Sequence, residues 1–139
     1  MGYDMCMREY SFHILAKNKE NALAAIKALA DKDTHYAWVS TENFVRAKSL
    51  PEATKVWGWH IEEDPESGNI VGIDFFGEKL GDDKILLDAI APFVEPGSFI
   101  EMSGEDSAIW RWAFNGKICI EVEPDIIWTY PEGFLENES

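Results

Sequence analysis

Hydrophobic and polar residues change their spacing several times along the chain. In "REYSFHILAK" (8–17) apolar and polar side chains alternate, and this period of two predicts a strand. From Asn18, a candidate helix cap, through residue 31, apolar side chains recur every three or four positions. This spacing predicts a helix with one apolar face, so the chain is expected to begin with a strand followed by a helix.

The middle of the chain returns to shorter elements. "HYAWVST" (35–41) predicts another strand, and the segment 41–59 predicts one or two short helices with Thr41 and Ser49 as caps. "WHIEED" and "NIVGIDFFGEKL" then flank the turn-forming residues 65–69. The two flanking segments are therefore expected to pair as a β-hairpin.

The last third predicts one helix and three strands. The helix follows Asp82, its expected cap, and carries a second apolar stripe. The strands are expected within 98–106, 108–117 and 119–128, separated by turns. The tail from Pro131 is polar and is expected to fray.

This order of elements predicts one α+β domain over residues 1–139. We expect a single mixed or antiparallel sheet with the two main helices on one face, and a ferredoxin-like variant is one arrangement of that kind. The residues expected in the core are Phe12, Ile14, Leu23, Ile26, Leu29, Ile73, Phe75, Leu86, Ile90, Trp112 and Ile120.

Three aromatic side chains occupy alternate positions in "AIWRWAF": Trp110, Trp112 and Phe114. Alternate positions of a strand point to the same face, so these rings must meet something apolar. The favoured interpretation is that they pack under the helices as core. The alternative is an exposed aromatic platform, which would mark an interaction site.

Charge is the most unusual global property, with 26 acidic and 12 basic residues and a net charge of −14. Residues 1–61 hold eight basic and seven acidic residues, whereas residues 62–139 hold four and nineteen. Such a surface repels phosphates, so direct binding of nucleic acid is not expected. It favours encounter with a basic protein, although acidic surfaces also serve solubility alone.

Cys6 and Cys119 lie far apart, and the N-terminal residues contain no long apolar run. These features favour a cytoplasmic protein with reduced thiols and no membrane segment. His13, His35 and His60 lie in unrelated segments without other ligands at metal-binding spacing. Neither a calcium loop nor a phosphate-binding loop is formed, so no metal and no cofactor is expected.

A catalytic alternative uses the carboxylates of Glu101 with Glu105 or Asp106, because neighbouring acids can raise one another's pKa for general acid chemistry. Ser103 and Ser107 lie nearby, but no motif ties a histidine to either serine. An enzyme is therefore the less favoured class.

The segments "MCMREYSFHILAKNKENALAAIKAL" and "FFGEKLGDDKILLDAIAPFVEPGSFIEMSGEDSAIWRWAF" resemble a group of small, acidic, uncharacterised proteins of phages and mobile elements in gut bacteria. The resemblance implies a genomic setting in which small acidic proteins block host defence enzymes or neutralise toxins. It carries over no catalytic residue.

The sequence thus predicts a non-enzymatic inhibitor that docks a basic nuclease or nucleic-acid-binding partner. A toxin immunity protein and a small enzyme remain as alternatives. The acidic residues expected to contact the partner are Glu62, Glu63, Asp64, Glu66, Glu101, Glu105 and Asp106. Trp59 or Trp110 is the expected aromatic anchor on the condition that its ring is exposed.

Overall fold

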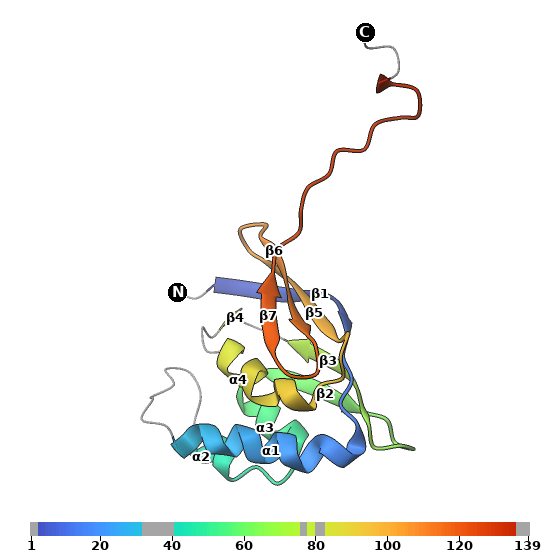
Figure 1. The fold of residues 1–139 in the computed structure, drawn as a ribbon. Coiled ribbons are helices and arrows are strands. Elements are labelled where there is room, and N and C mark those ends of the chain that lie inside the picture. The colour runs from blue at the N-terminus through green and yellow to red at the C-terminus, as the bar shows by residue number, and fades with distance from the viewer. Residues whose placement is uncertain (1–2, 32–40, 76–77, 80–82, 136–139) are drawn as a thin grey trace.

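The computed structural model describes residues 3–31, 41–75, 78–79 and 83–135, and these residues form an α+β fold, as predicted. The α-helices are α1 (Lys19–Ala28), α2 (Thr41–Val45), α3 (Leu50–Val56) and α4 (Asp83–Ile90). The strands are β1 (Tyr3–Ser11), β2 (Trp59–Glu63), β3 (Ile70–Phe75), β4 (Glu78–Lys79), β5 (Phe99–Gly104), β6 (Ile109–Phe114) and β7 (Cys119–Val122). Figure 1 shows the helices gathered on one side of the strands.

The larger sheet has the strand order β4-β1-β5-β6-β7, and each of its described pairs is antiparallel. β5 and β6 form a hairpin in which Met102 lies opposite Trp110 and Ile100 lies opposite Trp112. β7 is the last strand in this order, so one of its edges is open among the residues that the structure describes.

β2 and β3 form a separate two-stranded sheet, so the expected single sheet is wrong. Their hairpin meets the rest of the chain at Ile14 and Ile70, which exchange backbone hydrogen bonds of 3.1 and 2.8 Å beyond the end of β1. β5 pairs along β1, so among the described residues this bridge is the backbone pairing that links the hairpin to the chain beyond β1. In a ferredoxin-like variant the two strands between the main helices join the same sheet as the outer strands. Here β2 and β3 form their own sheet, so a ferredoxin-like variant is not confirmed.

The helices cover the inner face of the larger sheet with the stripes that the sequence predicts. α1 buries Ala22 and Ile26, and α4 buries Leu86, Leu87 and Ile90. The side chains of both stripes join one hydrophobic core with the inner faces of β5 and β6. The opposite face of the larger sheet, which we call the outer face, therefore points to solvent.

Two of the predicted caps can be compared with the described helices. Ser49 caps α3, because its hydroxyl accepts a hydrogen bond from the backbone N–H of Glu52 at 3.3 Å. Asn18 precedes α1 without such a bond. Its backbone already has helical angles, since residues 16–18 form a 3-10 turn that runs into the helix.

Most of the predicted core is confirmed. Leu23 is only partly buried, and Ile120 is wrong, because 48% of it is exposed. In β7 the alternation of side chains directs Cys119 inward and Ile120 outward. Trp110, Trp112 and Phe114 are buried, so the interpretation of these rings as core is confirmed.

Several predicted element boundaries differ from those in the structure. β1 begins at Tyr3 and ends at Ser11, whereas the alternating pattern pointed to residues 8–17. β7 ends at Val122, six residues before the expected end of the last strand. The strand predicted over 35–41, apart from Thr41 at the start of α2, lies outside the described residues.

Candidate interaction surfaces

The first candidate surface is the tip of the β2–β3 hairpin, which we call the acidic hairpin: Glu62, Glu63, Asp64 and Glu66. Its turn is built by Asp64, whose carboxylate accepts hydrogen bonds from the backbone N–H of Glu66 at 3.2 Å and the hydroxyl of Ser67 at 2.9 Å. These bonds favour the charged carboxylate and hold the pKa of Asp64 below its usual value. Asp64 therefore shapes the turn and keeps its negative charge.

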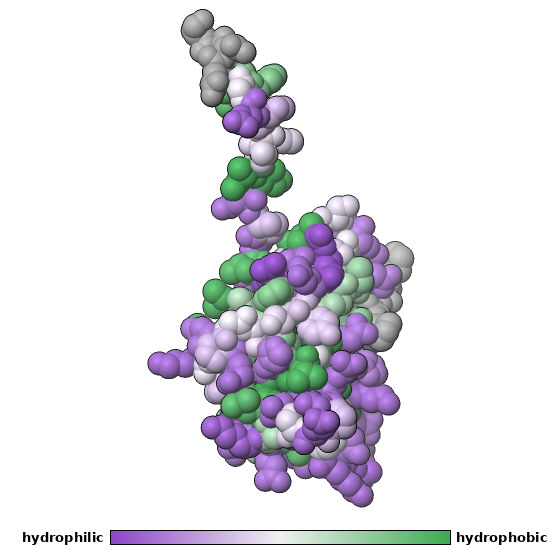
Figure 2. Space-filling model, turned by 90° about the vertical axis from the view of Figure 1, so that its right-hand side faces the viewer, coloured by the Kyte–Doolittle hydropathy of each residue, from purple (hydrophilic) through white to green (hydrophobic). Residues whose placement is uncertain are grey.

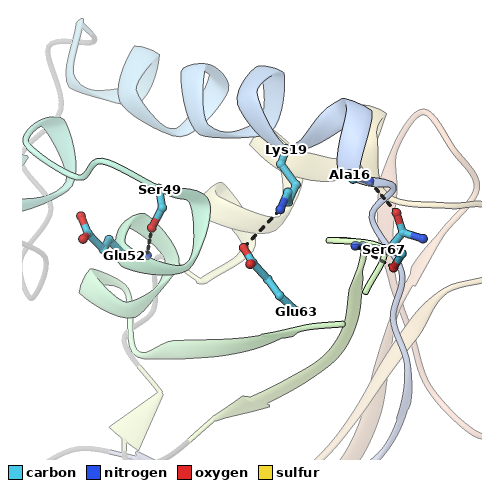
Figure 3. Close-up of polar contacts among 7 residues, drawn as sticks. Ala16, Lys19, Ser49, Glu52, Glu63 and Ser67 are labelled. Atoms are coloured by element: carbon cyan, nitrogen blue, oxygen red, sulfur yellow. Dashed lines mark hydrogen bonds and ion pairs between the residues drawn. The ribbon is translucent and has the colours of Figure 1, made fainter. Parts of the chain in front are cut away.

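The acidic hairpin is attached to the start of α1 (Figure 3). The side-chain oxygen of Asn69 accepts a hydrogen bond from the backbone N–H of Ala16 at 2.7 Å. The ammonium group of Lys19 lies 3.4 Å from the carboxylate of Glu63. Glu63 is therefore partly neutralised, whereas Glu62, in β2 opposite Gly72, and Glu66, in the turn, are exposed.

Glu105 and Asp106 lie at the other end of the molecule. The backbone N–H of Glu105 bonds to the carbonyl oxygen of Asp4 at the start of β1, whereas the acidic hairpin meets the chain just beyond the end of β1. Asp4 and Ile14 lie ten positions apart in the chain, which is roughly 30 Å along an extended backbone. The expectation that the two acidic turns form one surface is therefore wrong.

Glu101 is not an available negative charge. Its carboxylate lies on the outer face, 2.7 Å from the guanidinium of Arg111 and 3.5 Å from that of Arg8. Only 14% of its side chain is exposed, against 43% for each arginine. Two positive charges surround one carboxylate, so this part of the outer face is basic, contrary to expectation.

Neither proposed aromatic anchor meets its condition. Trp59 is fully buried, and its indole N–H donates a hydrogen bond to the carboxylate of Asp83, with 3.0 Å between nitrogen and oxygen. Trp110 is 6% exposed and packs edge-to-face against Trp112. Both are wrong as exposed anchors, because both rings lie in the hydrophobic core.

The polar groups named in the catalytic alternative make local contacts in the structure. Asp106 accepts a hydrogen bond from the backbone N–H of Ala108 at 3.1 Å, and the hydroxyl of Ser103 lies 3.2 Å from the sulfur of Cys6. Within the described ranges, no group of three His, Cys, Asp and Glu residues could hold a metal ion.

The structure shows a second candidate surface that the sequence did not predict: an extended arm over residues 123–135. In Figure 1 it leads away from the body after β7. Ile126, Ile127 and Trp128 are 81%, 82% and 79% exposed. In Figure 2 hydrophobic residues stand out along this arm between hydrophilic ones. The arm is thus apolar and exposed, although the alternating signal in the same residues predicted a strand.

The tip of the arm has its own local order. The rings of Tyr130 and Phe134 stack with centroids 5.7 Å apart and planes 8° from parallel. The backbone N–H of Phe134 bonds to the carbonyl oxygen of Pro131 at 3.0 Å, and Gly133 supplies the positive φ of this turn. The arm therefore ends in a defined turn, in the region where a frayed polar tail was expected.

The outer face beside the arm is apolar as well. Ile109, Ile120 and Val122 expose their side chains there, and the guanidinium of Arg111 lies 4.1 Å from the centre of the Phe99 ring. A hollow of about 290 Å³ opens on this face. It is lined by Glu101, Ile109, Trp110, Arg111, Val122, Glu123 and Pro124.

Comparison with protein families, curated proteins and solved structures gave no match to this chain. In the parts of the chain that the structure covers, no helix combines the length and apolar character that a membrane crossing requires.

The two cysteines differ in environment. Cys6 is exposed, whereas Cys119 is buried at the end of the inner face. Burial raises the pKa of the Cys119 thiol to about 12, because the charged thiolate is poorly solvated there. Cys119 therefore acts as a small hydrophobic core residue and not as a reactive thiol.

Proposed function

We propose that this chain is a non-enzymatic acidic binding protein that docks a basic protein partner, such as a nuclease or another nucleic-acid-binding protein. The observation that carries the proposal is the acidic hairpin, which exposes carboxylates beside a turn held by its own hydrogen bonds. The arm supports protein binding in general, because large apolar side chains that stay about 80% exposed on an extended segment are typical of an element that buries them against another protein.

Charge supports the chemistry of the partner. Residues 62–139 hold nineteen acidic and four basic residues. The acidic hairpin exposes Glu62 at the end of β2 and Glu66 on a turn that the hydrogen bonds of Asp64 hold in place. A basic groove approaching this turn gains long-range attraction, which raises the association rate more than it slows dissociation. An inhibitor of the counter-defence kind, which the resemblance to small phage proteins implies, is the proposed form.

The test is capture of partners from a lysate of the source cells, followed by binding kinetics with the purified partner. The charge-reversal variant carries Glu62→Lys and Glu66→Lys. Its matched control carries Glu9→Lys and Glu105→Lys, two exposed acids on other elements that give the same change in net charge. We expect the hairpin variant to lower the association rate constant by roughly tenfold and the control to change it little.

Salt provides an independent check on the same complex. Raising ionic strength to about 0.5 M shortens the screening length to a few Å, so the association rate of the unmodified protein should fall. Capture of no basic protein, or equal effects of the two double variants, would sink the proposal.

A further inference from the structure

We infer that the partner of the arm is a second copy of this chain, and that each arm lies on the outer face of the other copy. The inference rests on the proposed function in one respect, since it takes the arm as a protein-binding element. It leaves the acidic hairpin, which belongs to the separate β2–β3 sheet, free for the basic partner.

The first step is that the arm's own copy does not cover it. Glu123 and Pro124 line the hollow on the outer face and mark the point where the arm leaves. Trp128 lies six residues beyond the end of β7, so an extended chain carries it up to roughly 20 Å from the sheet. It is 79% exposed there, which shows that the arm points away from its own outer face.

The second step is that the outer face has the shape and composition to receive such an arm. Its hollow of about 290 Å³ is bounded by the aliphatic side chains of Ile109 and Val122 and by Pro124. Arg111 forms another wall, and a guanidinium is a favourable neighbour for the face of an incoming indole or phenol ring. The open edge of β7 beside it can offer backbone hydrogen bonds to an extended segment.

The third step is charge. The arm carries Glu123, Asp125 and Glu132, and it holds no lysine or arginine between residues 123 and 135. On the outer face Arg8 and Arg111 lie against the carboxylate of Glu101, and Glu123 also lines the hollow, so the receiving face is close to neutral. The two arginine side chains are each 43% exposed, so they are the groups that the carboxylates of an incoming arm would contact.

The fourth step is area. An aromatic side chain buries roughly 150–250 Å² when it is fully covered, and the arm offers three of them beside three aliphatic ones. Two exchanged arms and the two faces they cover then remove roughly 2,000 Å² from water, above the ~1,000 Å² that a specific interface requires. The exchange also satisfies closed twofold symmetry, since each copy gives one arm and receives one.

The experiment is sedimentation velocity on the full chain over a wide concentration range. The arm variant carries Ile126→Ser, Ile127→Ser and Trp128→Ser, and the face variant carries Ile109→Glu and Ile120→Glu. Both sets lie at exposed positions, so both variants are expected to fold, which circular dichroism will verify. The unmodified protein should be a dimer, and each variant should weaken dimerisation by about 100-fold or more.

A mixture of the two variants separates arm exchange from any other dimer. The face variant keeps an intact arm and the arm variant keeps an intact face, so the mixture should form a heterodimer through one arm while neither variant pairs with itself. The double variant Glu62→Lys, Glu66→Lys should dimerise like the unmodified protein.

Three outcomes would overturn the inference. These are a monomer at every concentration, a dimer that persists in both variants, and a mixture that forms no heterodimer. None of them touches the proposed function, which is judged by partner capture and by the hairpin variant.

Discussion

β6 and the arm have similar composition and opposite environments. β6 reads "IWRWAF" and the arm contains "DIIWTY", each rich in isoleucine and aromatic residues. In β6 the rings of Trp110, Trp112 and Phe114 lie under the helices. In the arm Ile126, Ile127 and Trp128 face solvent. Composition thus determines how much apolar surface a segment presents for burial. Whether the segment buries that surface within its own chain depends on a second layer of helices or strands packed against it.

The strongest test of this difference in burial is to replace one tryptophan of each segment with alanine. Trp112→Ala should lower the free energy of unfolding by about 3–5 kcal/mol, because it opens a cavity beside Trp59 and Trp110. Trp128→Ala should change it by less than about 0.5 kcal/mol at protein concentrations low enough to keep copies apart. Urea denaturation followed by circular dichroism measures both, and equal losses would mean that the arm folds onto its own body.

Isoleucines give a second, slightly smaller contrast. Ile26→Ala or Ile90→Ala should cost about 2–5 kcal/mol, because both side chains lie fully in the core. Ile126→Ala, the matched change in the arm, should leave the melting temperature of the separated copies nearly unchanged. If neither core substitution lowers the melting temperature, the helix stripes do not hold the sheet.

A third difference between buried and exposed tryptophans is the hydrogen-bond partner of the indole N–H group. Trp59 donates its N–H to buried Asp83, whereas the exposed position of Trp128 lets water accept its hydrogen bond. Asp83→Ala should therefore cost about 1–3 kcal/mol, because it strands a buried donor. The control Asp88→Ala, on the same helix, removes an exposed pair with Lys84 and should cost only about 0.3–0.5 kcal/mol. A loss at Asp83 no larger than at Asp88 would contradict the role given to this hydrogen bond.

The smallest effect is expected on the outer face, which lies between these two extremes of burial. Glu101→Gln should lower the free energy of unfolding by about 1 kcal/mol or less, because Arg8 and Arg111 remain accessible to water after the carboxylate is lost. The difference from the unmodified protein should shrink in high salt. A loss that is large and independent of salt would show that the ion pairs behave as buried ones.

Local patterns were sufficient to predict much of the fold. Residues at helical spacing such as Ile26 and Ile90 do face the core, and turn residues around Gly68 do join β2 to β3. Local patterns do not encode which strands become neighbours. The separate β2–β3 sheet depends on contacts between Ile14 and Ile70, 56 positions apart in the sequence. Nothing in the alternation of either segment predicts that contact.

The candidate surfaces were predicted less well, for physical reasons. Glu101 and Arg111 become partners because β5 and β6 place them opposite each other, a register that a list of charges cannot give. The arm was missed because a short apolar run such as "IIW" is typical of a strand whether or not a neighbouring strand is present to pair with it. The change from "CIEV" to "EPDIIW" contains the only available signal, since Pro124 cannot donate a ladder hydrogen bond and favours the end of a strand.

The acidic hairpin belongs to the separate β2–β3 sheet, whereas the arm follows β7, and the two lead away from the body in different directions (Figure 1). This separation has a consequence for avidity. A pair of copies joined through their arms would carry two acidic hairpins, each far from the shared contact. A partner with two basic grooves, or a dimeric one, could then engage both hairpins, and the second contact would form within one complex at an effective concentration in the millimolar range if the spacing matches. Individually weak, salt-sensitive contacts would combine into a long-lived bivalent complex.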